Sequence, residues 1–116
     1  MEVKMSNEQQ IQQVEISIEA AEKKVNLRDS LYKLLDNDGF KEVVGDGYFK
    51  EEASRLVTNK ANPGLQDEDS QKFIDNSIIA IGYFQQYLQN IEQMGNMAEK
   101  SLEDDKTTRQ ELLGEG

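Results

Sequence analysis

The stretch Asp36-Asn37-Asp38-Gly39 carries side-chain oxygens of the kind that bind calcium. In an EF-hand loop, glycine holds the sixth position and acidic ligands hold the first and the twelfth. With Gly39 in the sixth position, the first would be Leu34 and the twelfth Gly45, and neither supplies a carboxylate. We therefore interpret the stretch as a turn that ends a helix, with Asx side chains bonded to the backbone.

A second glycine-containing stretch, Gly45-Asp46-Gly47, has the composition of a backbone nest for an anion. The acidic residues Asp38, Glu42 and Glu51 lie close to it in the sequence, and their charge opposes a phosphate there. The sequence favours a turn in which Asp46 caps the helix that follows.

Few residue types in this chain are suited to catalysis. His and Cys are both absent, which removes the commonest general bases, thiol nucleophiles and zinc ligands. No serine lies in a G-x-S-x-G or S-x-x-K context, and no glycine-rich phosphate-binding motif occurs. Acid pairs such as Asp104-Asp105 are expected by chance among 23 acidic residues. We predict no catalytic residue, no metal and no cofactor, and hence a protein that is not an enzyme.

The composition limits the size of the core and the choice of partner. The 116 residues suffice for one domain, and apolar residues make up 36% of them, against roughly 45–50% in an ordinary domain. We therefore expect an elongated molecule with a thin core. A net charge of −10 repels nucleic-acid phosphates and anionic membranes, so we expect neither as a direct partner. Met1–Gln13 has no apolar stretch of the kind found in signal peptides, which predicts a cytoplasmic protein.

The first long segment has the spacing of a coiled-coil helix. Ser6 and Gln9 stand three residues apart, as in a capping box. Apolar residues then recur at alternating steps of three and four until Arg28, which we expect to interrupt the seam. These apolar residues are Ile11, Val14, Ile18, Ala21 and Val25. We predict one helix from about Asn7 to Leu35.

A second helix is predicted from Tyr48 to about Asn59, followed by the breaker sequence Asn62-Pro63-Gly64. Within it, Glu51 and Arg55 stand four residues apart, in the order that favours an intrahelical ion pair. We expect this pair to be the main role of Arg55, and contact with a partner to be the alternative.

The third and longest helix is predicted from about Glu68 to Leu102. Its apolar residues cover about half of the helix circumference, more than the ~100° stripe of an ordinary surface helix. A helix of this kind contacts more than one neighbour. Short loops favour antiparallel packing, so the predicted fold is all-α: an elongated antiparallel helical hairpin with a small helical head at about Phe40–Val57. We expect a single helical domain over residues 1–116, flexible at 1–6 and from about 104 to 116.

The third helix also carries the candidate interface. A glycine inside a helix costs roughly 1 kcal/mol against alanine, and close approach of another helix would explain Gly95, whereas Gly82 points away from the apolar face. Tyr83 and Tyr87 lie at the edge of that face, either as interface residues or packed within the same chain. The candidate interface residues are Tyr83, Tyr87, Met94, Gly95 and Ala98.

Three strings in the sequence carry a resemblance to a known group of proteins. They are Gly47-Tyr48-Phe49-x-x-Glu52-Ala53-x-Arg55-Leu56-Val57, then Ala80-Ile81-Gly82, then Gly95-x-x-Ala98-Glu99. Over about Arg28 to Glu103 the chain resembles small acidic helical proteins of tailed bacteriophages, a group with no established activity. The resemblance implies a phage source and a role in the virion or its assembly. It implies no functional residues.

The sequence thus favours a non-enzymatic bacteriophage structural or assembly protein that acts through helix-mediated oligomerisation or by docking on a virion component. We expect protein partners, either further copies of the chain or a virion component, and a location in the virion or the cytoplasm of the infected bacterial cell. The alternative is a small acidic host-directed inhibitor or adaptor, including a DNA mimic. Lysines such as Lys23, Lys24 and Lys50 interrupt the acidic residues, which argues against mimicry.

Overall fold

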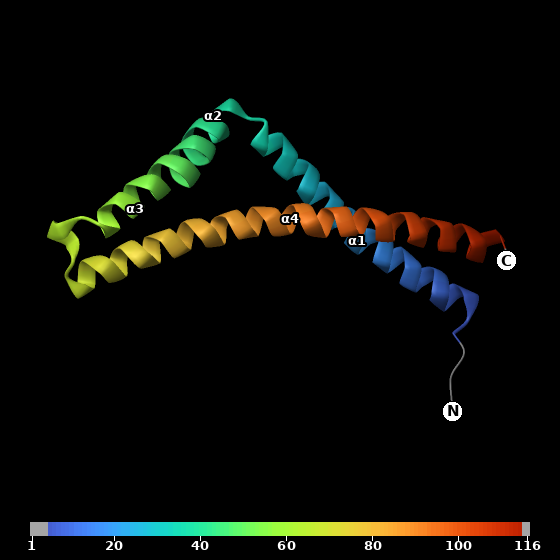
Figure 1. The fold of residues 1–116 in the computed structure, drawn as a ribbon. Helices are drawn as coiled ribbons and strands as arrows, with labels where there is room; N and C mark the ends of the chain where they lie inside the picture. Colours follow the sequence, from blue (N-terminus) through green and yellow to red (C-terminus); the bar gives the residue numbers. More distant parts are fainter. Residues whose placement is uncertain (1–4, 115–116) are drawn as a thin grey trace. The chain divides into compact units, whose positions relative to one another are not determined.

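The computed structural model describes residues 5–114, and every regular element within that range is helical (Figure 1). The all-α fold class is therefore confirmed. The elements are α1 (Asn7–Leu35), α2 (Asp38–Phe40), the π-helix η1 (Lys41–Glu52), α3 (Ala53–Lys60), the 3₁₀ turn η2 (Pro63–Leu65) and α4 (Glu68–Gly114).

Both long helices begin at the predicted residues because side chains in their first turns satisfy free backbone groups. At the start of α1, the Gln9 N–H donates to Ser6 Oγ at 3.2 Å and the Ser6 N–H donates to Gln9 Oε1 at 3.0 Å. At the start of α4, the Ser70 N–H donates to the Asp67 carboxylate at 2.9 Å. Hydrogen bonds to Ser70 lower the pKa of Asp67. The predicted capping box is confirmed.

The predicted end of the last helix was wrong. We expected it near Leu102, but α4 continues to Gly114, so most of the tail expected to be flexible lies within the helix. The other ends expected to be flexible, residues 1–4 and 115–116, lie outside the described residues.

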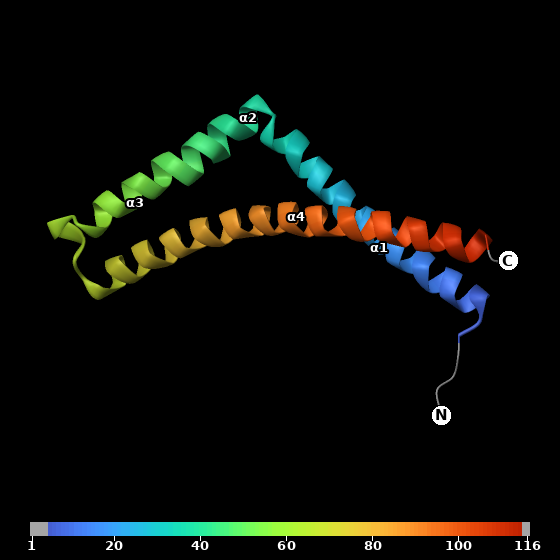
Figure 2. The same ribbon diagram turned by 45° about the vertical axis from the view of Figure 1, so that its right-hand side comes forward.

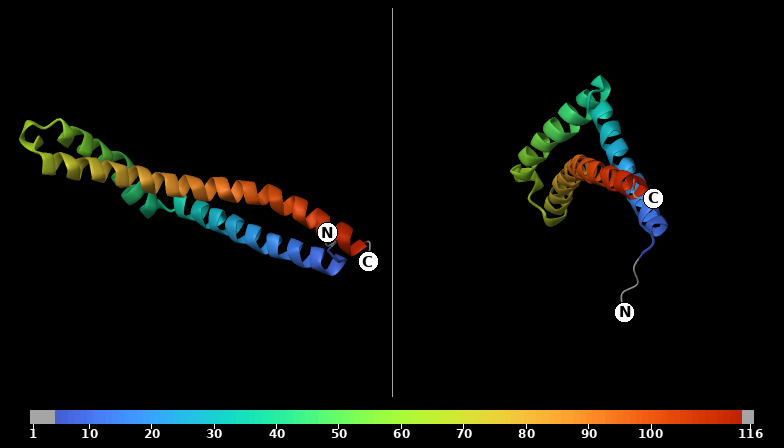
Figure 3. Two further views of the ribbon diagram at one scale, coloured as in Figure 1. Left: turned by 90° about the horizontal axis from the view of Figure 1, so that it is seen from below. Right: turned by 90° about the vertical axis from the view of Figure 1, so that its right-hand side faces the viewer.

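The chain divides into two compact units, a terminal unit (the described parts of Met1–Ser30 and Ile91–Gly116) and a central unit (Leu31–Asn90). The terminal unit is an antiparallel pair of α1 and the end of α4 (Figure 3). Ser17 Oγ donates to Asp105 at 2.5 Å, and Arg28 meets Glu99, so α1 and α4 run in opposite directions. The predicted antiparallel helical hairpin is confirmed.

The central unit contains a second antiparallel pair, formed by α3 and the first half of α4 (Figure 2). Its core is Leu56, Ile74 and Ile81, and Leu56 is only 2% exposed. The rings of Tyr48 and Phe49 lie against Phe84, with centroids 6.2 and 5.4 Å from it. Further apolar side chains pack on this core, namely Ala53, Leu65 and Ile78.

The turn predicted at Gly45-Asp46-Gly47 was also wrong. Helical backbone continues from α2 through η1 into α3, with Phe40 and Ala53 at the two ends of η1 both in the right-handed helical region. Asp46 therefore caps nothing and instead pairs with Lys50, four residues later, at 3.5 Å. Packing of the neighbouring aromatic rings on α4 overrides the weak helix propensity of the glycines.

In each unit, the packed residues of α4 recur at alternating steps of three and four. We call these residues the inner seam. In the central unit these residues are Ile74, Ser77, Ile81, Phe84 and Leu88. In the terminal unit they are Ile91, Gly95, Ala98, Leu102, Asp105, Arg109 and Leu112. All of them are buried or partly buried.

The central core should depend strongly on Leu56. Leu56→Ala should lower the free energy of unfolding by about 2–5 kcal/mol, because it leaves a cavity against Ile74 and Ile81. The adjacent Val57 is 64% exposed, so Val57→Ala should change stability by no more than about 0.5 kcal/mol. Urea unfolding followed by circular dichroism measures both variants, and equal effects would contradict the assigned core.

Candidate interaction surface

In the central unit, α4 carries a second stripe of residues at alternating steps of three and four, which we call the outer seam. Each of its residues directly precedes an inner-seam position, and one residue corresponds to about 100° of rotation around an α-helix. The outer seam consists of Phe73, Asn76, Ala80, Tyr83, Tyr87 and Asn90. All six residues are exposed, whereas the inner seam beside them is packed.

The outer seam exposes three aromatic side chains on one helix face. Phe73 is 70% exposed, Tyr83 68% and Tyr87 57%. Single exposed apolar residues are ordinary on soluble proteins, whereas several exposed aromatic residues that share one helix face are typical of an interaction surface. Tyrosine suits such a surface because its ring is apolar and its hydroxyl can stay hydrated.

Apart from Phe73, the other five outer-seam residues, from Asn76 to Asn90, lie in a stretch without charged residues. No Asp, Glu, Lys or Arg occurs between Asp75 and Glu92, although charged residues make up 31% of the chain. A partner that docks here therefore does not have to strip water from an ionised side chain of this stretch. The outer seam thus combines apolar area with a low desolvation cost.

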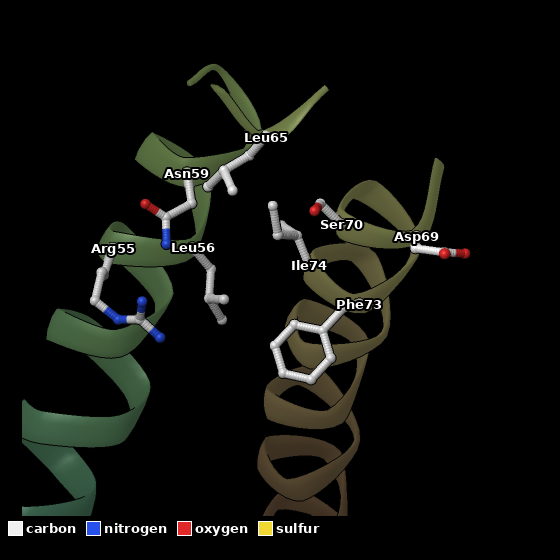
Figure 4. A pocket seen from close by; sticks show the side chains of 8 residues that line it. All are labelled: Arg55, Leu56, Asn59, Leu65, Asp69, Ser70, Phe73 and Ile74. Atoms are coloured by element: carbon white, nitrogen blue, oxygen red, sulfur yellow. The ribbon is translucent and has the colours of Figure 1, made fainter. Parts of the chain in front are cut away.

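A hollow of about 390 Å³ opens between α3 and α4 next to Phe73 (Figure 4). Leu56 and Ile74 point toward each other across it, and Asp69 points away. The remaining lining residues are Arg55, Asn59, Leu65, Ser70 and Phe73. A lining that includes Leu56, Leu65 and Ile74 can accept an apolar side chain.

Arg55 in this hollow is engaged within its own helix. Its Nε donates to Glu52 Oε2 at 3.0 Å, and a second hydrogen bond joins the same two side chains. These hydrogen bonds raise the pKa of Arg55 and lower that of Glu52. The predicted intrahelical pairing of Arg55 is thus present, but with Glu52 and not with Glu51.

In the terminal unit, the side chain of Arg28 crosses α4 at Gly95. A Cβ atom placed on Gly95 would overlap Arg28 Cβ and would lie 2.9 Å from its Cγ and 2.8 Å from its Cδ. Arg28 is only 8% exposed, so the expectation that it interrupts the seam of α1 was wrong: it occupies the seam. Gly95 is required because the arginine stem occupies the space of a side chain.

The Arg28 guanidinium donates hydrogen bonds to three neighbouring side chains. Its Nη1 donates to Asn96 Oδ1 and to Glu99 Oε2, both at 2.9 Å, and its Nη2 donates to Asp29 Oδ1 at 3.1 Å. The hydrogen bond to Glu99 is the main cause that raises the pKa of Arg28, and it lowers the pKa of Glu99. This buried cation is therefore paired, as burial requires.

The five candidate interface residues fall into two groups. Tyr83 and Tyr87 lie exposed on the outer seam, and Met94 is 45% exposed in the terminal unit. Gly95 and Ala98 are buried in the inner seam against α1 of the same chain. The sequence reasoning missed Phe73, Asn76 and Asn90 as neighbours of the tyrosines. Asn76 and Asn90 each stand seven residues from Tyr83, and Phe73 stands two such repeats before Tyr87, and this spacing was the signal that could have identified them.

No protein-family model matches the chain, and no curated protein or solved structure shows significant similarity to it. Within residues 5–114, no cluster of His, Cys, Asp or Glu is placed to hold a metal ion. None of the helices in this range has a stretch long and apolar enough to cross a membrane. The binding properties of the outer seam therefore have to be inferred from its own residues.

The two internal glycines of α4 should respond oppositely to alanine. Gly95→Ala should destabilise the protein by about 1–3 kcal/mol, because the methyl group overlaps the stem of Arg28. A Cβ on Gly82 meets no atom within 4 Å, so Gly82→Ala should stabilise the helix by up to about 1 kcal/mol. Thermal melting of both variants beside the parent is the measurement. A higher melting temperature for Gly95→Ala would refute the close packing.

The Arg28–Glu99 contact should make the stability of the folded chain depend on pH. Because the pKa of Glu99 is lowered in the folded chain, the contribution of its charge is complete above the unfolded value of about 4.3. It is lost as the pH falls through the folded pKa. Glu99→Gln should therefore lower the melting temperature at neutral pH and have a smaller effect in acid.

Glu103, an exposed residue four positions further along α4, provides the control for this series. Glu103→Gln should change the melting temperature little at any pH. A Glu99→Gln effect that is constant from neutral to acid pH would show that the ionised carboxylate does not hold Arg28.

Proposed function

We propose that this chain is a non-enzymatic structural or assembly protein of a bacteriophage, and that it docks on a protein through the outer seam of α4. The observation that carries the proposal is the exposure of the aromatic stripe Phe73, Tyr83 and Tyr87 beside a packed inner seam. Both antiparallel helix pairs pack through the inner seam and leave the outer seam exposed. The apolar residues of the outer seam are therefore available to a partner.

The functional groups of this surface suit binding better than catalysis. The outer seam offers the phenol hydroxyls of its two tyrosines and the amides of Asn76 and Asn90, all of which can make hydrogen bonds to a partner. In the neighbouring hollow, the only cation, Arg55, is held by Glu52. These features support association as the activity of the chain.

The charge of the chain supports a protein as the partner. A net charge of −10 opposes the approach of nucleic acid or of an anionic membrane. Around the outer seam, the charge-free stretch from Asn76 to Ile91 matches the depletion of charged residues at the centres of protein interfaces. Aromatic residues such as Tyr87 are enriched at the same interfaces.

Several residues of the strings that resemble phage proteins pack inside this fold. Tyr48 and Leu56 from the first string belong to the central core, and Gly95 and Glu99 from the last contact Arg28. The resemblance thus bears on how such a chain folds, and it supports a phage origin.

Mass spectrometry of purified phage particles tests the proposal. The chain should be present in several copies, and Tyr83→Glu combined with Tyr87→Glu should deplete it from the particles because charge is placed on the docking face. Gln85→Glu with Gln89→Glu adds the same charge at exposed positions outside the outer seam and should leave incorporation unchanged. Absence of the parent chain from particles and from assembly intermediates would refute the proposal and favour a host-directed role.

A further inference from the structure

The outer seam has the repeat of a coiled-coil stripe. Phe73, Ala80 and Tyr87 stand seven residues apart, and so do Asn76, Tyr83 and Asn90. Residues at these spacings pack into the holes of a facing helix that carries the same repeat. The stripe extends over roughly 26 Å of helix, at 1.5 Å per residue. A second copy of α4 presents a matching surface of the same length.

The charge-free stretch allows a second copy to dock here despite the net charge of the chain. Each copy carries a net charge of −10, so two copies repel each other over most of their surfaces. The stretch from Asn76 to Ile91 is the longest in the sequence without a charged residue. Two copies that meet there bury no like-charged pair. A strongly basic partner would find no acidic side chain to pair with in this stretch.

The two asparagines determine which way the helices run. A buried amide needs hydrogen-bond partners, and each asparagine offers both donors and an acceptor. In a parallel, in-register pair, Asn76 meets the partner's Asn76 and Asn90 meets the partner's Asn90, so each amide faces an amide. In the antiparallel pairing centred on the same stripe, Asn90 meets the partner's Phe73, which leaves its amide unsatisfied.

We propose that the outer seam forms a parallel, in-register helix pair with the outer seam of a second copy, and that Asn76 and Asn90 set its register. This inference rests on the proposed function, because it names the partner of the same docking face. A polar residue inside a coiled-coil stripe is known to select register and number of strands at some cost in affinity.

Disulfide trapping on the full chain tests the register, since the protein has no cysteine of its own. Asn76→Cys and Asn90→Cys, made separately, should each form a disulfide-linked dimer under mild oxidation, because like residues face each other within disulfide reach. Gln89→Cys, exposed beside Asn90 but outside the outer seam, should remain monomeric in the same gel. Equal trapping at Gln89 would overturn the inference.

The antiparallel arrangement predicts a different pattern. Neither asparagine variant would then trap itself, but a mixture of Ala80→Cys and Tyr83→Cys chains would form a mixed disulfide. That result would overturn the parallel register while keeping the second copy as the partner.

Sedimentation equilibrium of the cysteine-free chain tests whether a second copy of the chain binds the outer seam. The parent should be a dimer at micromolar concentrations, and Tyr83→Glu with Tyr87→Glu should be a monomer with unchanged helix content. Gln85→Glu with Gln89→Glu should remain a dimer. A parent that stays monomeric up to hundreds of micromolar overturns the inference. If that monomer still enters particles through Tyr83 and Tyr87, the proposed function stands, whereas a dimer that is absent from particles refutes the function alone.

Discussion

The inner seam of α4 supplies one side of both antiparallel helix pairs, and the rest of the structure depends on this arrangement. In the central unit it packs on α3 through Ile74 and Ile81, and in the terminal unit on α1 through Gly95 and Ala98. Alternating steps of three and four keep one stripe of a helix directed at a neighbour. A single stripe buries few residues, which explains how a chain with 36% apolar residues can fold.

In the terminal unit the seam is narrow, and a charged side chain fills part of it. A buried guanidinium contributes little net stability, because the loss of its hydration offsets its pairing. Arg28 has a more specific consequence, since it fits only where Gly95 leaves space and where Asn96 and Glu99 accept its hydrogen bonds. We interpret Arg28 as the residue that fixes the register of α1 on α4, where small side chains alone would permit slippage.

Local features of this fold were predictable from sequence, and features that depend on distant contacts were not. The capping box at Ser6 involves residues within three positions, so its spacing identified the start of α1. The turn predicted at Gly45–Gly47 was wrong because packing on α4 outweighs glycine propensity. The burial of Arg28 depends on acceptors 68 and 71 residues away, which spacing along the chain does not reveal.

The candidate surface was predicted in part for a related reason. The positions of apolar residues around the last helix indicated an apolar arc wider than one neighbour needs. Tyr83 and Tyr87, at the edge of this arc, are indeed exposed. Helical projection alone did not divide that arc into a packed stripe and an open stripe. It therefore grouped Gly95 and Ala98, which face α1, with the tyrosines, which face outward.

The central claim is that the inner seam suffices to fold the chain and leaves the outer seam free for association. Far-UV circular dichroism across a dilution series, recorded beside the oligomeric state at each concentration, tests this claim most directly. The account predicts an unchanged helix signal per residue at concentrations where the chain is monomeric. A helix signal that falls in step with dissociation would contradict it, because the outer seam would then belong to an obligatory shared core.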